Sequence, residues 1–242
     1  MQDEAIRELL DGVLARLDGA ADPDRAREAK RFFPGEVRVL GTPSGWANDL
    51  GRGLSNALRA QGGSVEDALW LAERLYREQT MEAGAVANEM LGRWWRRLAE
   101  EHWDRFDGWL DWFNNWGTTD SFCLKVAGPL AARDGARAAL LREWAESPNV
   151  WRRRAALVTL IPAARKGGET DLLLELCRKL LQDEEPYVQK AIGWSLKELC
   201  KGDMDAVIGF LQAHGDAMPA STLRYACERM TDAERALARR GA

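Results

Sequence analysis

The sequence predicts an all-α protein built from stacked helix pairs, and three observations support this prediction. Apolar residues recur at intervals of three and four in nearly every segment, no segment alternates as a strand would, and short turn motifs interrupt the pattern. With 46% hydrophobic and 30% charged residues, the 242-residue chain has the composition of a folded protein with a sizeable core. We expect one domain over residues 1–242.

The helical pattern begins near the N-terminus and is interrupted at short intervals. The first apolar stripe comprises Ala5, Leu9, Leu10, Val13, Leu14 and Leu17. Breaks follow at residues 21–24, 41–44, 62–64, 117–119, 147–149, 166–168, 183–186 and 215–219. Several of these breaks supply a helix N-cap followed by proline or by an acidic first turn. The pattern predicts roughly a dozen helices of about ten to eighteen residues, joined by short turns.

The sequence also resembles itself at a spacing of 36 residues. Residues 148–167 overlay on residues 184–203. The matched pairs are Trp151 with Tyr187, Arg154 with Lys190, Ala155 with Ala191, Leu160 with Leu196 and Ala164 with Cys200. A repeat of this length, each a helix pair, is the signature of an α-solenoid of the HEAT or armadillo kind. We expect the inner helices to line a concave face.

Several protein classes are excluded by composition. The longest apolar stretch, residues 155–164, is about half of a membrane span, and residues 1–30 are too charged for a signal peptide, so we expect a cytoplasmic protein. The four cysteines stand far apart without a CxxC pair, and the chain has two histidines. We therefore expect buried free thiols, with no metal and no organic cofactor.

The charge distribution indicates a basic surface within an acidic protein. The formal net charge is −4, which argues against wholesale coating of nucleic acid. Residues 151–201 contain ten Lys and Arg against seven Asp and Glu, so this segment carries +3 and the remainder −7. This segment is the candidate for local contact with a polyanion.

Two clusters interleave aromatic residues with arginines. They are residues 94–97 and residues 151–154, and six of the eleven tryptophans fall between Trp94 and Trp116. Such clusters suit phosphate contact with stacking on a base or sugar, but tryptophans facing the core beside snorkelling arginines give the same pattern. In the second cluster, three consecutive arginines point in different directions around a helix, so at least one must lie near the groove face.

Trp116 and Asp120 are a further candidate pair. They are four residues apart, so in a helix they stand on one face, with a carboxylate beside an aromatic surface. The alternative is that Asp120, preceded by Thr118 and Thr119, only caps the start of a helix.

Three sequence windows together resemble one known family. They are Asn115-Trp116 with Asp120, then Asn149-Val150-Trp151 leading to Arg154-Ala155-Ala156, then the segment from Gln189 to Trp194 that continues into Ser195-Leu196-Lys197-Glu198. In order and spacing they resemble the AlkD family of DNA alkylation repair glycosylases across about eighty residues. The resemblance implies a HEAT-like solenoid that cups duplex DNA, with the site-bearing repeats at about residues 110–201.

The resemblance also implies roles for individual residues. Trp116 and Trp194 resemble the two cleft tryptophans of the family, Asp120 resembles its catalytic carboxylate, and Arg154 resembles its cleft arginine. Further DNA-binding candidates are Arg152, Arg153, Lys190 and Phe32. Phe32 stands where the best known members have a tyrosine, so a hydroxyl is missing. Gly117 stands where the family often has an acidic residue.

Chemistry makes this set of residues suitable for one reaction. A purine alkylated at N3 or N7 is cationic, so its glycosidic bond is labile and the base leaves without being protonated. Tryptophan faces and a carboxylate stabilise the positive charge that spreads over base and sugar as the bond breaks. We therefore expect a monomeric DNA glycosylase that acts on positively charged N-alkylpurines in double-stranded DNA, away from membranes.

Two other functions fit the same sequence. One is a non-catalytic scaffold or DNA-binding protein on the same fold, because fold alone does not establish activity. The other is a glycosylase specialised for bulky alkyl adducts of a toxic natural product. Retention of Trp116, Asp120, Arg154 and Trp194 together favours an enzyme over the scaffold.

Overall fold

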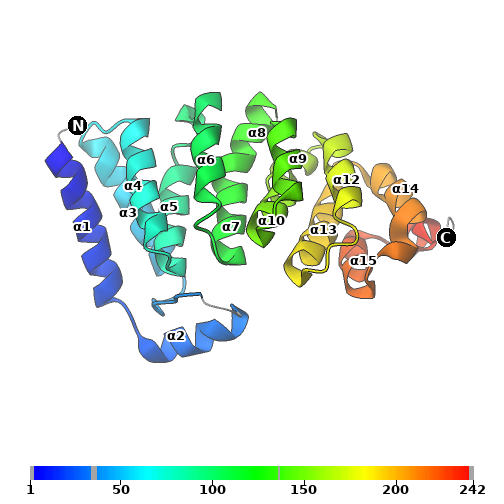
Figure 1. Ribbon diagram of the computed structural model, residues 1–242, viewed down its shortest axis with the longest axis horizontal. Helices are drawn as coiled ribbons and strands as arrows, with labels where there is room; N and C mark the ends of the chain where they lie inside the picture. Colours follow the sequence, from blue (N-terminus) through cyan, green and yellow to red (C-terminus); the bar gives the residue numbers. More distant parts are fainter. Residues whose placement is uncertain (1–2, 34–36, 136, 240–242) are drawn as a thin grey trace. The chain divides into compact units, whose positions relative to one another are not determined.

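The computed structural model describes residues 3–33, 37–135 and 137–239 (Figure 1). Within these ranges the secondary structure is helical apart from one isolated bridge between Arg38 and Thr80, which confirms the all-α prediction. Contacts divide the chain into two compact units, Met1–Ala127 and Gly128–Ala242. Organisation as a single domain stays a prediction.

The first unit is built around helix α5. Its helices are α1 (Asp3–Gly19), α2 (Pro23–Ala29), α3 (Trp46–Ala60), α4 (Val65–Arg77), α5 (Met81–Gly92), α6 (Trp103–Trp109) and α7 (Trp116–Phe122), and a π-helical segment, Cys123–Ala127, follows α7. Helix α5 packs against α3, α4 and α7. Side chains of Asp22, Ser64, Thr80 and Asn115 cap the starts of α2, α4, α5 and α7.

The second unit is built around helix α13. Its helices are α8 (Gly128–Asp134), α9 (Ala138–Glu146), α10 (Val150–Val158), α11 (Ile161–Ala164), α12 (Thr170–Lys179), α13 (Pro186–Leu199), α14 (Met204–His214), α15 (Ala220–Ala226) and α16 (Asp232–Ala238). Helix α13 packs against α10, α11 and α15. Each unit therefore holds a row of neighbouring helices, α3 with α5 and α7, and α10 with α13 and α15. A continuous solenoid with a concave DNA-binding face stays a prediction.

Some predicted boundaries are wrong. Residues 117–119 are not a break but lie inside α7, because Asn115 caps the helix two residues earlier. Several helices have only seven residues, below the predicted length. In the 36-residue repeat, α10 ends at Val158 while its counterpart α13 runs on to Leu199. Pro162 explains the difference, because proline lacks the amide hydrogen that would continue the helix.

The tryptophan-rich segment is largely core. Trp94, Trp103 and Trp109 are fully buried. The Trp109 ring packs against Tyr76, and the Trp103 ring packs against Phe106. The indole nitrogen of Trp94 donates to the Ser55 hydroxyl at 3.1 Å.

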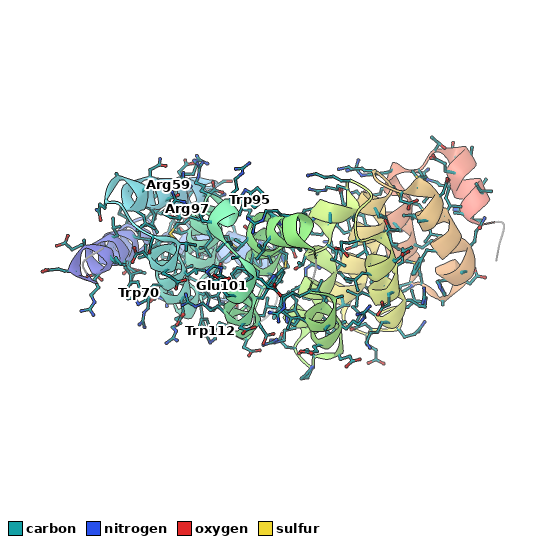
Figure 2. The ribbon with its side chains drawn as sticks, turned by 90° about the horizontal axis from the view of Figure 1, so that it is seen from above. Arg59, Trp70, Trp95, Arg97, Glu101 and Trp112 are labelled. Atoms are coloured by element: carbon teal, nitrogen blue, oxygen red, sulfur yellow. The ribbon has the colours of Figure 1, made fainter. Side chains whose placement is uncertain are left out.

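Two arginines lie over the buried Trp94 ring. The guanidinium groups of Arg59 and Arg97 lie 5.1 and 4.8 Å from the centre of the Trp94 ring. Figure 2 shows Arg59, Trp95 and Arg97 near one another on the first unit. Core packing with snorkelling arginines is therefore confirmed for Trp94.

All four cysteines are free thiols. The prediction that they are buried is confirmed for Cys123, Cys177 and Cys200 but is wrong for Cys227, which is partly exposed. Burial, together with the nearby Cys227, raises the pKa of the Cys200 thiol to about 11. Among the described residues, no three His, Cys, Asp or Glu side chains are grouped so that they could hold a metal ion. In the same ranges, no helix combines the length and apolarity that a membrane crossing requires.

Candidate functional site

The start of α7 positions the first candidate pair. The Asn115 side-chain oxygen accepts a hydrogen bond from the Thr118 amide at 2.8 Å, and the Thr119 hydroxyl donates to the Asn115 carbonyl at 2.8 Å. Asn115 is therefore the cap, and the interpretation of Asp120 as a capping residue is wrong. Asp120 lies in the helix interior with 9% of its surface exposed, one turn beyond Trp116 and on the same face.

Trp116 is held by the segment that follows α2. Its indole nitrogen donates to the Phe32 carbonyl at 3.0 Å, and its ring stacks on Phe33 with centroids 4.9 Å apart and planes inclined by 14°. The Phe33 ring is buried, while the Phe32 side chain is 71% exposed. Phe33 is thus a site residue that the sequence reasoning missed, because two consecutive phenylalanines do not reveal which ring faces inward.

Gly117 provides the space for this stacked pair. A Cβ atom at residue 117 would lie 3.3 Å from Cε1 of Phe33 and 3.2 Å from Oδ1 of Asn115, both tighter than ordinary contacts. A larger side chain therefore requires the Phe33 ring to move. Glycine stands here in place of the acidic residue that the family often has, and it lets the Phe33 ring pack close against α7.

Buried hydrogen bonds tie α7 to the rest of the first unit. The Tyr76 hydroxyl donates to the Asn88 side chain at 2.7 Å, and the Asn88 amide nitrogen donates to the Thr118 carbonyl at 3.0 Å. Burial, and secondarily Cys123, raises the pKa of Tyr76 well above its ordinary value, so the phenol stays a neutral donor. A Cβ at Gly84 would lie 2.6 Å from the Thr118 hydroxyl oxygen, so glycine permits the close approach of α5 and α7. Trp116 and Asp120 are thus carried by a rigidly anchored helix.

The three consecutive arginines of α10 have different environments. Arg154 is 3% exposed and donates to the Tyr187 carbonyl. Arg153 forms an ion pair with Asp183 at 2.6 Å and donates to the carbonyls of Ser147 and Pro148 at 2.9 and 3.0 Å. Arg152 is half-buried. The contacts of Arg153 tie the start of α10 to the turn before α13.

Helix α13 carries the remaining candidates. Lys190 is exposed and Trp194 is half-buried, one turn apart on the same helix face. A groove of about 610 Å³ runs beside Lys190, between α13 and α15.

Glu198, near the end of the same helix, has a structural role. Its carboxylate is buried and binds Arg165, Lys201 and Arg229 at 2.7 to 3.0 Å. Burial opposes ionisation, but hydrogen bonds from these three cations outweigh it and lower the pKa of Glu198 to about 2.

The structure groups the predicted site residues within units. Trp116, Asp120 and the Phe32 backbone come together in the first unit, and Arg154, Lys190 and Trp194 belong to the α10 and α13 row of the second. The pairing of Trp116 with Trp194 across one cleft stays a prediction.

Comparison with known proteins assigns the chain to a family. A family model described as DNA alkylation repair enzyme matches residues 13–230, so the chain belongs to this family. Membership supports a role in DNA alkylation repair. A search of curated proteins finds no match.

A solved structure supports the fold. It is a predicted DNA alkylation repair enzyme from Enterococcus faecalis, 20% identical, with a TM-score of 0.76, and the match covers 88% of this chain and 97% of that one. At this identity the likeness shows that the two chains share an all-α fold.

Proposed function

We propose that the protein is a DNA glycosylase that hydrolyses the N-glycosidic bond of positively charged N3- or N7-alkylated purines in double-stranded DNA. The observation that carries the proposal is the arrangement on α7. Asp120 is buried one turn beyond Trp116, and Asn115 has taken over the capping role that would otherwise explain the carboxylate. Membership of the alkylation repair family supports the choice of substrate.

The chemistry follows from the charge of the lesion. A cationic purine is already a good leaving group, so the reaction needs stabilisation of positive charge rather than a strong acid. The Asp120 carboxylate stabilises the developing sugar cation and orients the attacking water, while Trp116 and Trp194 attract the cationic base through their ring faces. The stack on Phe33 and the bond to the Phe32 carbonyl hold the Trp116 ring in advance of binding.

The second unit supplies the backbone contacts in this proposal. Arg152 on α10 and Lys190 on α13 interact with phosphates, which position the duplex without reading its sequence. Arg154 is 3% exposed and donates to the Tyr187 carbonyl, so a phosphate reaches it only when that hydrogen bond is exchanged. Arg153 supports this surface through its ion pair with Asp183. In the first unit, the exposed Phe32 ring is a further candidate contact with DNA.

The experiment measures release of free base from duplex DNA that contains N7-methylguanine or N3-methyladenine. We expect the wild-type protein to release the base and Asp120→Asn to lose this activity, with unchanged helical circular dichroism and equal or slightly tighter DNA binding. The reason is that a carboxylate repels phosphates in the ground state and helps only as the sugar cation develops. Asp11→Asn, at an exposed position on α1, is the matched control and should keep full activity.

Two outcomes contradict the proposal. Excision that survives in a folded Asp120→Asn variant rules out the catalytic role of this carboxylate. A wild-type protein that binds the duplex and releases no base supports the alternative function, a non-catalytic DNA-binding scaffold.

A further inference from the structure

A cationic groove lies between α13 and α15 and extends beyond the residues that the family resemblance marks. Its lining includes Gln189, Lys190, Lys197, Arg224, Tyr225 and Glu228. We call it the α13–α15 groove. Its volume of about 610 Å³ is ample for a phosphate group and part of a nucleotide.

The walls of the groove are fixed by close packing. A Cβ at Gly193 would lie 2.9 Å from the Thr222 carbonyl oxygen and 3.1 Å from Cβ of Tyr225, so α13 and α15 approach closely where glycine stands. Beside that contact, the Gln189 amide donates to the Leu181 and Asp183 carbonyls at 2.9 Å and accepts from the Thr222 hydroxyl at 3.2 Å. The groove is therefore preformed rather than a gap between mobile side chains.

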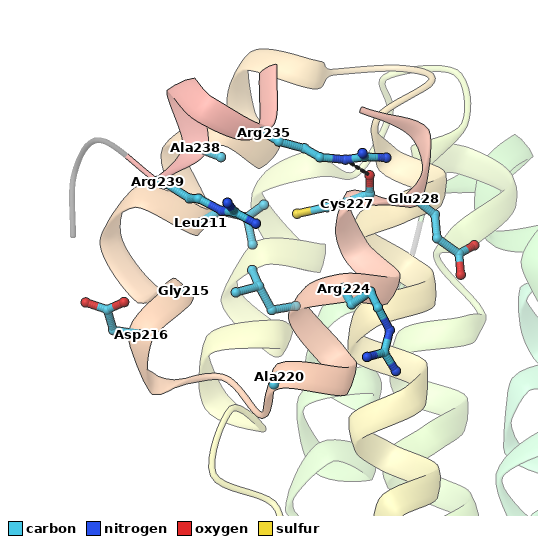
Figure 3. A pocket seen from close by; sticks show the side chains of 11 residues that line it. Leu211, Gly215, Asp216, Ala220, Arg224, Cys227, Glu228, Arg235, Ala238 and Arg239 are labelled. Atoms are coloured by element: carbon cyan, nitrogen blue, oxygen red, sulfur yellow. Dashed lines mark hydrogen bonds between the residues drawn. The ribbon is translucent and has the colours of Figure 1, made fainter. Parts of the chain in front are cut away.

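The groove contains more cations than carboxylates. Lys197 is 2.6 Å from the Glu228 carboxylate, and its ammonium group lies 4.5 Å from the centre of the Tyr225 ring. This pairing neutralises one lysine, while Lys190 and Arg224 are both exposed. Figure 3 views the neighbouring cavity and shows Arg224 and Glu228 extending away from Arg235 and Arg239. The positive charge at this groove is therefore in excess and accessible.

We propose that the α13–α15 groove binds the phosphate backbone of duplex DNA, on the α15 side of Trp194. Lys190, Trp194 and Lys197 follow one another at intervals of four and three along α13, so a strand that reaches Trp194 also passes the groove. A phosphate entering the groove competes with Glu228 for Lys197 and gains Arg224 as a second partner. The inference rests on the proposed DNA substrate but not on catalysis.

The competition with Glu228 yields two effects of opposite sign. Arg224→Gln and Lys190→Gln each remove a phosphate contact. Log affinity falls with log salt, and each substitution should make this fall shallower, reducing the magnitude of the slope by about 0.9. Between 50 and 200 mM salt, a change of that size alters the ratio of variant to wild-type affinity about threefold. Glu228→Gln frees Lys197 and should strengthen binding. A merely structural groove would not predict tighter binding from loss of an ion pair.

The assay is fluorescence anisotropy with an undamaged duplex over a series of salt concentrations. Glu146→Gln is the matched control for Glu228→Gln, because Glu146 pairs with Lys179 between α9 and α12 and does not line the groove. Arg178→Gln, an exposed cation on α12, is the control for removed charge. We expect both controls to keep the wild-type slope and affinity.

Three results would overturn the proposal. One is a wild-type slope in both Arg224→Gln and Lys190→Gln, and another is weaker binding by Glu228→Gln. The third would show that the groove binds free phosphate and not the DNA backbone. In that case inorganic phosphate would raise the melting temperature of the wild type but not of Arg224→Gln, while the two proteins would have equal salt slopes of DNA binding. Because the duplex is undamaged, these readings are independent of base release, so failure of the glycosylase proposal is detected separately.

Discussion

Replacing Gly117 with alanine adds a single methyl group and so tests the packing of the candidate site. In Gly117→Ala the new Cβ would lie 3.3 Å from Cε1 of Phe33, so the ring must shift by a few tenths of an ångström. Alanine in a helix is favoured over glycine by roughly 1 kcal/mol. The stack of Phe33 on Trp116, with centroids 4.9 Å apart, contributes roughly 0.5 to 1.5 kcal/mol. The gain and the loss are of similar size, so we expect almost no net change in the free energy of unfolding.

The same substitution should behave differently when the ring is absent. In a Phe33→Ala background there is no stack to disturb, so Gly117→Ala should stabilise the protein by about 1 kcal/mol. The double-mutant cycle therefore has an expected coupling energy of about 1 kcal/mol between residues 33 and 117. Contact with Asn115 is common to both backgrounds and cancels in the cycle. Base release should also fall in Gly117→Ala, because the displaced Phe33 ring no longer fixes Trp116.

The measurement is urea unfolding followed by circular dichroism, with base release as the second reading. Gly53→Ala is the control, since Gly53 lies on α3 and a Cβ there would meet nothing within 4 Å. It should stabilise both backgrounds equally. Equal effects of Gly117→Ala in the two backgrounds would refute the argument that Gly117 makes room for Phe33.

Three further predictions concern charge. Arg153→Gln should lower the free energy of unfolding by about 3 kcal/mol, because it leaves the Asp183 carboxylate buried without its cation. The salt slope of DNA binding should not change, and an altered slope in this variant would show that Arg153 contacts a phosphate. Glu198→Gln should lower the free energy of unfolding by up to about 3 kcal/mol at neutral pH, because the pKa of Glu198 in the folded protein is depressed to about 2. In urea unfolding, this difference in stability from the wild type should vanish as the pH falls from about 4.5 to 2, and a difference that persists at pH 2 would contradict the prediction. The protein should release N7-methylguanine and should not release uracil or hypoxanthine; efficient release of these neutral bases would require a general acid. Trp194→Ala should slow the release of N7-methylguanine by about five- to thirtyfold and should have a smaller effect on the binding of undamaged DNA.

The sequence by itself determined the helical class and much of the local detail. Periodic apolar residues, with capping residues such as Asp22, Ser64 and Asn149 at predicted breaks, place helices correctly because these signals act within a few residues. The spacing of Trp116 and Asp120 likewise sets them on one face once the segment is helical. The family resemblance, which depended on order and spacing, agrees with the family match over residues 13–230.

Only the tertiary structure decided which of several equivalent side chains serves which purpose. Phe33 rather than Phe32 stacks on Trp116, Arg153 pairs with Asp183, and Trp94 faces the core. In each case adjacent residues have the same chemistry, and the choice depends on a partner about thirty or more positions away. Local propensity fixes the direction of a side chain around its own helix, whereas the neighbour that it meets is set by how helices distant in sequence pack together.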